Sequence, residues 1–90
     1  MNAMNIQAVY DANLTAEKNL RALLAEVERD HTQEAEWRDF LKYIGAPAEL
    51  ITEADAEIEK IASTLQKLED LILKNDEVFC ELHRMQRRMR

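Results

Sequence analysis

Two pairs of side chains in this 90-residue sequence have a spacing that could serve a metal site or catalysis. Glu28 and His31 are three residues apart, which places both on one face of a helix. Di-iron helical bundles use two such Glu-x-x-His pairs and two further glutamates. This sequence has no second copy, because Cys80 stands three positions before His83. We therefore interpret His31 as a paired or half-exposed histidine and predict no metal site.

Cys80 and His83 form the second pair, one helical turn apart. A zinc site needs four ligands, and a Cys–His nucleophile needs an oxyanion site that a bare helix lacks. Packing of Cys80 as a small apolar residue near Phe79 is the simpler interpretation. The sequence also has no glycine-rich phosphate loop, nucleophile elbow or catalytic triad pattern. We expect no enzymatic activity, no cofactor and no small-molecule substrate.

A group of arginines near the C-terminus is a candidate contact site for a polyanion, and its members are Arg84, Arg87, Arg88 and Arg90. Cations at the end of a helix also interact favourably with the helix dipole, which explains them without a ligand. The rest of the chain is acidic: the net charge is −6, and residues 47–77 hold three basic and nine acidic groups. Nucleic acid is therefore a disfavoured partner.

Composition predicts an all-α protein. One glycine and one proline leave too little turn material for a sheet, while 47% of the residues are apolar. No apolar run approaches the roughly 20 residues that span a bilayer, and the N-terminal residues resemble no secretory signal. The single cysteine fits a reducing compartment. We expect a cytoplasmic protein that does not enter membranes.

The strongest pattern is a heptad repeat from Ile51 to Met89, typical of a helix that packs along other helices. The a positions are Ile51, Ile58, Leu65, Ile72, Phe79 and Gln86, and the d positions are Ala54, Ile61, Leu68, Asn75, Leu82 and Met89. A buried Asn75 would fix the register of the packed helices, whereas an Asn75 at the margin would be hydrated. The sequence leaves these two interpretations open.

A first helix is predicted over about residues 14–44. Its apolar face comprises Leu20, Leu23, Leu24 and Val27, and is continued by Trp37, Phe40, Leu41 and Ile44. We expect Trp37 to pack at the corner of the hairpin, with a partner-binding role as the alternative. Residues 1–13 are either an extension of this helix from about residue 5 or a segment before a start at Asn13 or Thr15. The extension is favoured because it matches the length of the second helix.

Gly45 and Pro47 mark the turn, at residues 45–47, and the second helix is predicted over about 47–89. A turn this short makes the two helices antiparallel neighbours, so residues 14–90 form a coiled-coil-like hairpin. Near the C-terminus the apolar surface of the second helix widens, because its g positions become apolar. We predict a partner or oligomer interface made of Leu68, Leu71, Ile72, Asn75, Val78, Phe79, Leu82 and Met85.

These patterns predict a non-enzymatic interaction, oligomerisation or adaptor module. Its partner would be a second copy, forming a four-helix bundle as a dimer, or another helical protein. One alternative is a small acidic chaperone that holds an amphipathic helix of a client protein. A second alternative is a small helical regulator that contacts nucleic acid through the arginine-rich tail.

Overall fold

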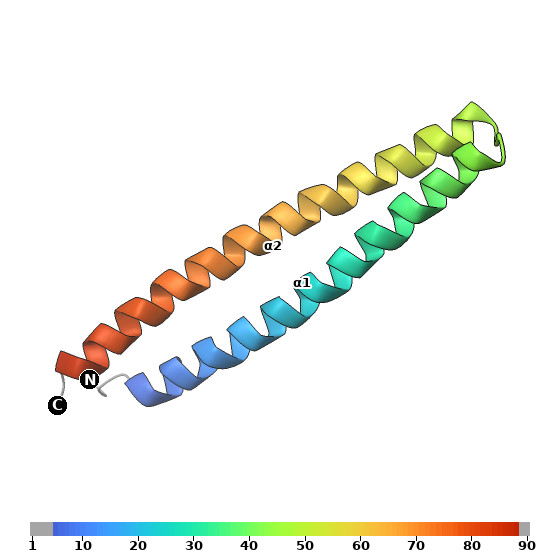
Figure 1. The fold of residues 1–90 in the computed structure, drawn as a ribbon. Helices are drawn as coiled ribbons and strands as arrows, with labels where there is room; N and C mark the ends of the chain where they lie inside the picture. The colour runs from blue at the N-terminus through green and yellow to red at the C-terminus, as the bar shows by residue number, and fades with distance from the viewer. Residues whose placement is uncertain (1–4, 89–90) are drawn as a thin grey trace.

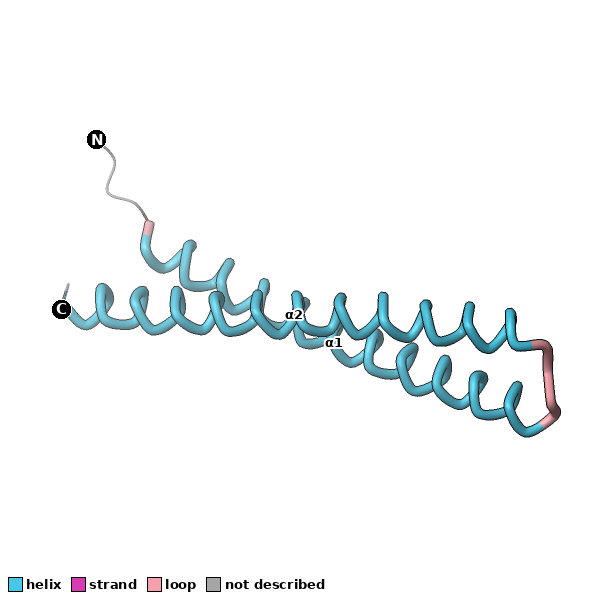
Figure 2. Tube along the Cα trace, turned by 90° about the horizontal axis from the view of Figure 1, so that it is seen from above, coloured by secondary structure: helices cyan, strands magenta, loops and turns pink. Residues whose placement is uncertain are grey.

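The computed structural model describes residues 5–88, which form two long helices joined by one turn. Helix α1 spans Ile6–Tyr43 and helix α2 spans Ala48–Arg88. They run antiparallel side by side as a rod of 66 × 18 × 15 Å (Figure 1). Seen from the second direction, the helices cross at a shallow angle near their middles (Figure 2), as expected for helices that pack through a heptad repeat. The all-α hairpin predicted from the sequence is confirmed.

The start of α1 is set by Asn5. Its Oδ1 accepts a hydrogen bond from the main-chain N–H of Ala8 at 3.1 Å, which satisfies one of the free donors of the first turn. The helix therefore includes residues 6–13, and neither Asn13 nor Thr15 starts it. Asn13 is instead buried between the two helices, with 8% of its surface exposed.

The turn has the geometry that Gly45 permits. Gly45 has a φ of +68°, a left-handed conformation that side chains other than hydrogen disfavour. Its N–H donates to the carbonyl oxygen of Lys42, and the N–H of Ala46 donates to that of Leu41. Together these two bonds form the Schellman motif that closes helix C-termini. Helix α2 then begins at Ala48, directly after Pro47.

The a and d positions predicted for α2 form the seam against α1. Every one of them from Ile51 to Gln86 is buried or half-buried. The fully buried members are Ala54, Leu68, Ile72 and Leu82. Met89, the last d position of the repeat, lies outside the described residues.

Helix α1 contributes a polar stretch to the seam between Val27 and Leu41. Its buried and half-buried positions also recur at steps of three and four, but near the turn they are occupied by His31, Glu34 and Arg38 before Leu41. The apolar stripe predicted through Trp37, Phe40 and Ile44 is wrong. Because the seam passes through residues 34, 38 and 41, the side chains of Trp37, Phe40 and Ile44 lie beside it and are about half exposed.

The hydrophobic core of one hairpin is thin. Five apolar residues of the described chain are buried, and none of its side chains is completely enclosed. The surface exposed is 6976 Å², whereas a compact protein of 10.5 kDa would expose about 5,400 Å². A single hairpin therefore leaves about 1,500 Å² more surface in contact with water than a globular fold would.

Candidate interaction surface

The two long sides of the hairpin differ in chemistry. In an antiparallel helix pair, the residues just before each a position line one side of the seam, and those just after each d position line the other. The first side, which we call the apolar flank, carries Val9, Leu23, Trp37 and Ile44 of α1 and Leu50, Leu71, Val78 and Met85 of α2, with Phe40 at its outer border. The second side, the charged flank, carries among others Arg21, Asp55 and Asp76.

Exposed large apolar residues are concentrated on the apolar flank. Ten such residues are exposed within residues 5–88, and the seven that lie on this side are Leu23, Trp37, Phe40, Ile44, Leu50, Leu71 and Val78. On the opposite flank the helical register places Leu14 and Leu73, while Tyr43 points away from both flanks. Surface apolar residues that occur singly are normal, but a contiguous row of them indicates a binding surface.

The apolar flank has two apolar parts with a polar interval between them. Close to the turn, Trp37, Phe40, Ile44 and Leu50 form a tip cluster, in which the Trp37 and Phe40 rings have centroids 5.9 Å apart. Farther from the turn, Leu71, Val78 and Met85 form an open-end cluster. Asp30, Glu57 and Thr64 occupy the interval. For Trp37 the favoured prediction was packing at the corner, with a partner-binding role as the alternative, although extending the repeat of Leu20, Leu24 and Val27 places Trp37 one residue off the seam.

The eight residues predicted as a partner interface fall into three groups. Leu68, Ile72 and Leu82 are buried by α1 within the same chain. Asn75, Phe79 and Met85 are half-buried. Leu71 and Val78 have 49% and 50% of their surface exposed, so together with Met85 they are the members that another chain can reach.

Phe79 and Asn75 make defined contacts inside the hairpin. The Phe79 ring lies 5.2 Å from that of Tyr10 and is stacked on His83, so it holds the open ends of the helices together. Asn75 forms a reciprocal pair with Asn13: the Asn13 side-chain amide donates to Asn75 Oδ1 at 2.9 Å, and the Asn75 side-chain amide donates to the main-chain carbonyl oxygen of Asn13 at 3.3 Å. Asn75 is therefore a seam residue with a polar partner.

The charged flank holds an interhelical group of three ionisable side chains. The hydrogen bond from Arg21 to Glu17, 2.9 Å long, lowers the pKa of Glu17, and a hydrogen bond from Asp76 lowers it further. The shared hydrogen bond with Glu17 raises the pKa of Asp76, and partial burial adds to this. Arg21 lies 3.9 Å from Asp76 and offsets part of the repulsion between the two carboxylates. The group links the two helices beside a shallow depression lined by Arg21, Leu24, Glu69, Ile72, Leu73 and Asp76.

The residues considered for chemistry are not assembled into a site. Within residues 5–88, no three His, Cys, Asp or Glu side chains are grouped as metal ligands. Cys80 is an exposed free thiol, and His83 faces Phe79. Arg84 is paired with Glu81 at 3.1 Å, Arg87 and Arg88 are exposed, and Arg90 lies outside the described residues.

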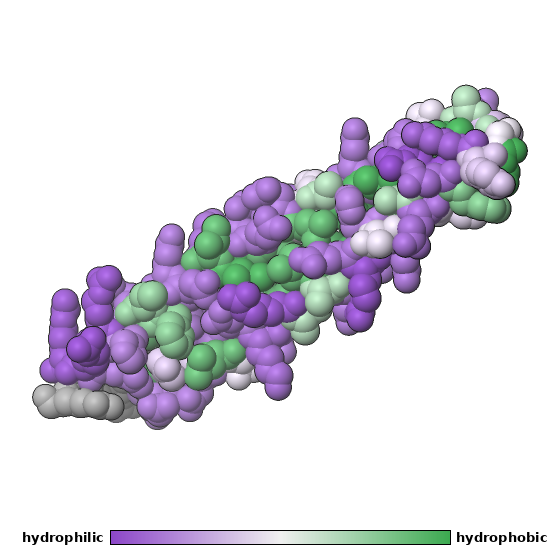
Figure 3. Space-filling model, in the orientation of Figure 1, coloured by the Kyte–Doolittle hydropathy of each residue, from purple (hydrophilic) through white to green (hydrophobic). Residues whose placement is uncertain are grey.

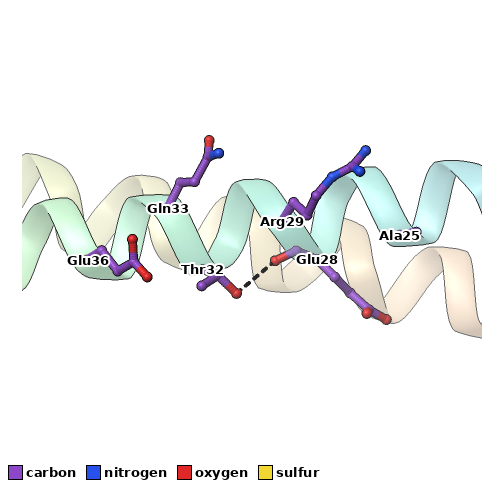
Figure 4. Close-up of a pocket in the computed structure, with 6 residues that line it drawn as sticks. All are labelled: Ala25, Glu28, Arg29, Thr32, Gln33 and Glu36. Atoms are coloured by element: carbon purple, nitrogen blue, oxygen red, sulfur yellow. Dashed lines mark hydrogen bonds between the residues drawn. The ribbon is translucent and has the colours of Figure 1, made fainter.

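A shallow depression on the outer surface of α1 does not provide a site either (Figure 4). It is lined by side chains of this one helix: Ala25, Glu28, Arg29, Thr32, Gln33 and Glu36. The Thr32 hydroxyl is bonded to the main-chain carbonyl oxygen of Glu28, and the longer side chains point away from one another into solvent. The side of the rod shown in Figure 3 is likewise mostly polar, with apolar surface along the groove between the helices and in smaller patches at the tip and near the open end.

Comparison with protein-family models, curated proteins and solved structures finds no match to this chain. Neither described helix contains a stretch that is long and apolar enough to cross a membrane. Function must therefore be inferred from the surface of the hairpin itself.

Proposed function

We propose that this chain is a non-enzymatic protein–protein interaction module that oligomerises through its apolar flank. The observation that carries the proposal is the position of the exposed apolar residues, seven of which share one side of the rod. Helical hairpins with such a side commonly bury it against a second helical pair, which gives a four-helix bundle. A second copy of this chain is the simplest partner, because it supplies the same surface.

The exposed area supports this proposal. The surface in excess of a compact fold is about 1,500 Å² per chain, and a standard protein interface buries about 800 Å² on each partner. Covering the apolar flank would also enclose Leu23, Leu71 and Val78, each of which is about half exposed in the single hairpin. Burial of this kind would give the thin core the extra apolar contacts that it lacks.

Sedimentation equilibrium of the wild type and two matched variants tests the proposal. Leu71 lies on the apolar flank and Leu73, two residues later on α2, lies on the other side. We expect the wild type and Leu73→Glu to form dimers at micromolar concentration and Leu71→Glu to be a monomer, because a buried carboxylate is costly. Circular dichroism of each variant controls for folding.

Two outcomes would contradict the proposal. One is a wild type that remains monomeric up to several hundred micromolar, which would favour a client-binding chaperone over a self-associating module. The other is equal dissociation of the Leu71 and Leu73 variants, which would show that the apolar flank is not the interface.

A further inference from the structure

We infer that two copies pack their apolar flanks with both turns at the same end, so that α1 of each copy lies along α2 of the other. The inference rests on the proposed self-association and adds its geometry. Two face-to-face arrangements have two-fold symmetry. An axis along the rods places the turns at the same end and packs α1 against α2. An axis across the rods places the turns at opposite ends, with α1 against α1 and α2 against α2.

Contacts inside one hairpin show which residues of the two helices lie at the same height along the rod. Asn13 is level with Asn75, and Arg38 is level with Asp55. Because both helices rise about 1.5 Å per residue, equal steps along α1 and α2 from these contacts stay level. An axis along the rods leaves every height unchanged. Each residue on the apolar flank of α1 therefore meets those residues of the second copy's α2 that are level with it.

Opposite charges then meet in the polar interval of the flank. On α1, Asp30 lies on the flank and Glu26 lies at its outer border, and both are exposed. On α2, Lys60 and Lys67 lie at the outer border. Within residues 5–88 only Lys60 of these four has an ion-pair partner, Glu57 at 4.0 Å, and its side chain is still 78% exposed. With the turns at the same end, Asp30 of each copy lies near Lys60 of the other, and Glu26 lies near Lys67. Complementary charges of this kind select orientation even where each exposed pair adds little affinity.

The other charges of the α2 flank meet no unpaired charge of the same sign. Glu53, Lys74 and Glu81, at its outer border, lie level with parts of the α1 flank that carry no charged residue. Glu57 is level with an uncharged part of α1 too, and Lys60 accompanies it within its own helix. The arrangement therefore gains attraction in the polar interval without repulsion elsewhere along the flank.

Apolar parts of the flank also meet apolar parts. Ile44 of each copy lies near Leu50 of the other, which joins the two tip clusters beside the turns. Farther along, the open-end cluster of each copy lies along the part of α1 that carries Leu23 and Val9. Burial of these side chains against one another removes apolar surface from water, which stabilises the dimer.

The opposite orientation matches the same residues less well. An axis across the rods pairs residues of one helix that are equally distant from its midpoint. Glu26 then lies against Leu23 of the second copy, so neither finds a partner of its own kind. Lys67 lies against Lys67 of the second copy, where the like charges repel each other. Charge and apolar matching therefore both favour turns at the same end.

An exchange of charges tests the contact between Glu26 and Lys67. Glu26→Lys should weaken dimerisation several-fold at low salt, because two cations then face each other across the interface. The double variant Glu26→Lys/Lys67→Glu restores opposite charges and should recover most of the lost affinity. Sedimentation equilibrium at low salt, where screening is weak, measures both dissociation constants. Glu59→Lys, on the opposite side of α2, is the control for the change in net charge.

Distances between spin labels measure the orientation itself. Tyr43, 88% exposed beside the turn, and Ala22, exposed near the middle of α1, lie on the outer side of the helix, away from the apolar flank. Labels at Tyr43→Cys or Ala22→Cys are placed in a Cys80→Ser background, because Cys80 is an exposed thiol. With the turns at the same end, both label pairs fall within about 35 Å, roughly three helix diameters. With the turns at opposite ends, the Ala22 labels stay within that range but the Tyr43 labels are about 55 Å apart.

The outcomes separate this inference from the proposed function. Short distances for both labels in pulsed electron paramagnetic resonance, with recovery of affinity in the double variant, support turns at the same end. A short Ala22 distance with a long Tyr43 distance overturns the inference and leaves the proposed dimer in place, as does a double variant no tighter than Glu26→Lys. A monomer in sedimentation, with no intermolecular distance for either label, overturns the proposed function and this inference with it. The unlabelled Cys80→Ser protein controls for the loss of the thiol.

Discussion

Asn13 of α1 and Asn75 of α2 hydrogen-bond to each other across the seam, 62 positions apart in the sequence. Each side chain reaches the partner residue, so the contact requires one alignment of the two helices. Asn13 Oδ1 is buried and has no hydrogen-bond partner among the described residues. The pair therefore specifies register at some cost in stability, as buried polar residues do in coiled coils.

Replacing one or both members of this pair tests that role. We expect Asn75→Leu to destabilise the hairpin by about 1–3 kcal/mol, because the buried Asn13 amide loses its shorter hydrogen bond, to Asn75 Oδ1, and keeps only the 3.4 Å bond to the main-chain carbonyl oxygen of residue 75. The double variant Asn13→Leu/Asn75→Leu is expected to regain that loss, since both polar groups are then removed. The free energies of unfolding in urea of the wild type, both single variants and the double variant form a double-mutant cycle, which measures the interaction between the two side chains. An additive double variant would show that the two amides do not interact.

The carboxylates of Glu17 and Asp76 predict a specific dependence of stability on pH. Because the pKa of Asp76 is raised in the folded state, its carboxylate destabilises the fold at neutral pH, and this penalty disappears as the pH falls through the folded pKa. Glu17 behaves oppositely. Because its pKa is lowered in the folded state, its carboxylate stabilises the fold above its ordinary pKa of 4.5, and this stabilisation is lost as the pH falls through the folded pKa.

Asp76→Asn separates these two effects. The variant is expected to melt at a higher temperature than the wild type at pH 7, with the difference shrinking as the pH falls toward 3.8, the ordinary value for aspartate. Glu77→Gln, an exposed neighbour with the same change in net charge, serves as the control. A difference from wild type that stays constant over this pH range would argue against coupling between Glu17 and Asp76.

The turn depends on the conformation of Gly45. A Cβ at this position would meet no atom within 4 Å, so the effect of a substitution comes from the backbone alone. We expect Gly45→Ala to cost about 1–2 kcal/mol, the usual penalty of a left-handed residue other than glycine. Gly45→Asn should lose less, because asparagine tolerates this region better. If urea unfolding shows the same loss of stability for the alanine and asparagine variants, the cost does not come from the positive φ.

Much of the fold could be predicted because apolar spacing in α2 is nearly regular. The a and d positions from Ile51 to Gln86 all lie in the seam, and the single glycine forms the turn. The path of the seam along α1 was harder to predict, since beyond His31 and Glu34 it passes through Arg38, whereas hydrophobicity favours a path through Trp37, Phe40 and Ile44. Partly exposed seam positions tolerate such residues when their charged ends reach water or a partner. Arg38, for example, lies 3.4 Å from Asp55.

The polar stretch of the seam on α1 also explains why only the part of the candidate surface on α2 was predicted. Leu71, Val78 and Met85 stand out at the g positions of an otherwise regular repeat. Trp37 and Phe40 were assigned to the core because aromatic residues next to Leu41 look like a continuation of its stripe. A shift of one residue rotates a side chain by about 100°, enough to move it from the seam to the flank. Sequence periodicity cannot resolve such a shift where the seam itself is polar.

The seam leucines should carry more stability than leucines on the surface. Leu68 is 5% exposed, whereas Leu73, five residues further along α2 and on another face of the helix, is 61% exposed. We expect Leu68→Ala to cost about 2–5 kcal/mol, and Leu73→Ala to change stability by less than about 0.5 kcal/mol. Both are measured at one fixed protein concentration, because self-association adds to apparent stability. A small loss at Leu68 would mean that the heptad does not face the core.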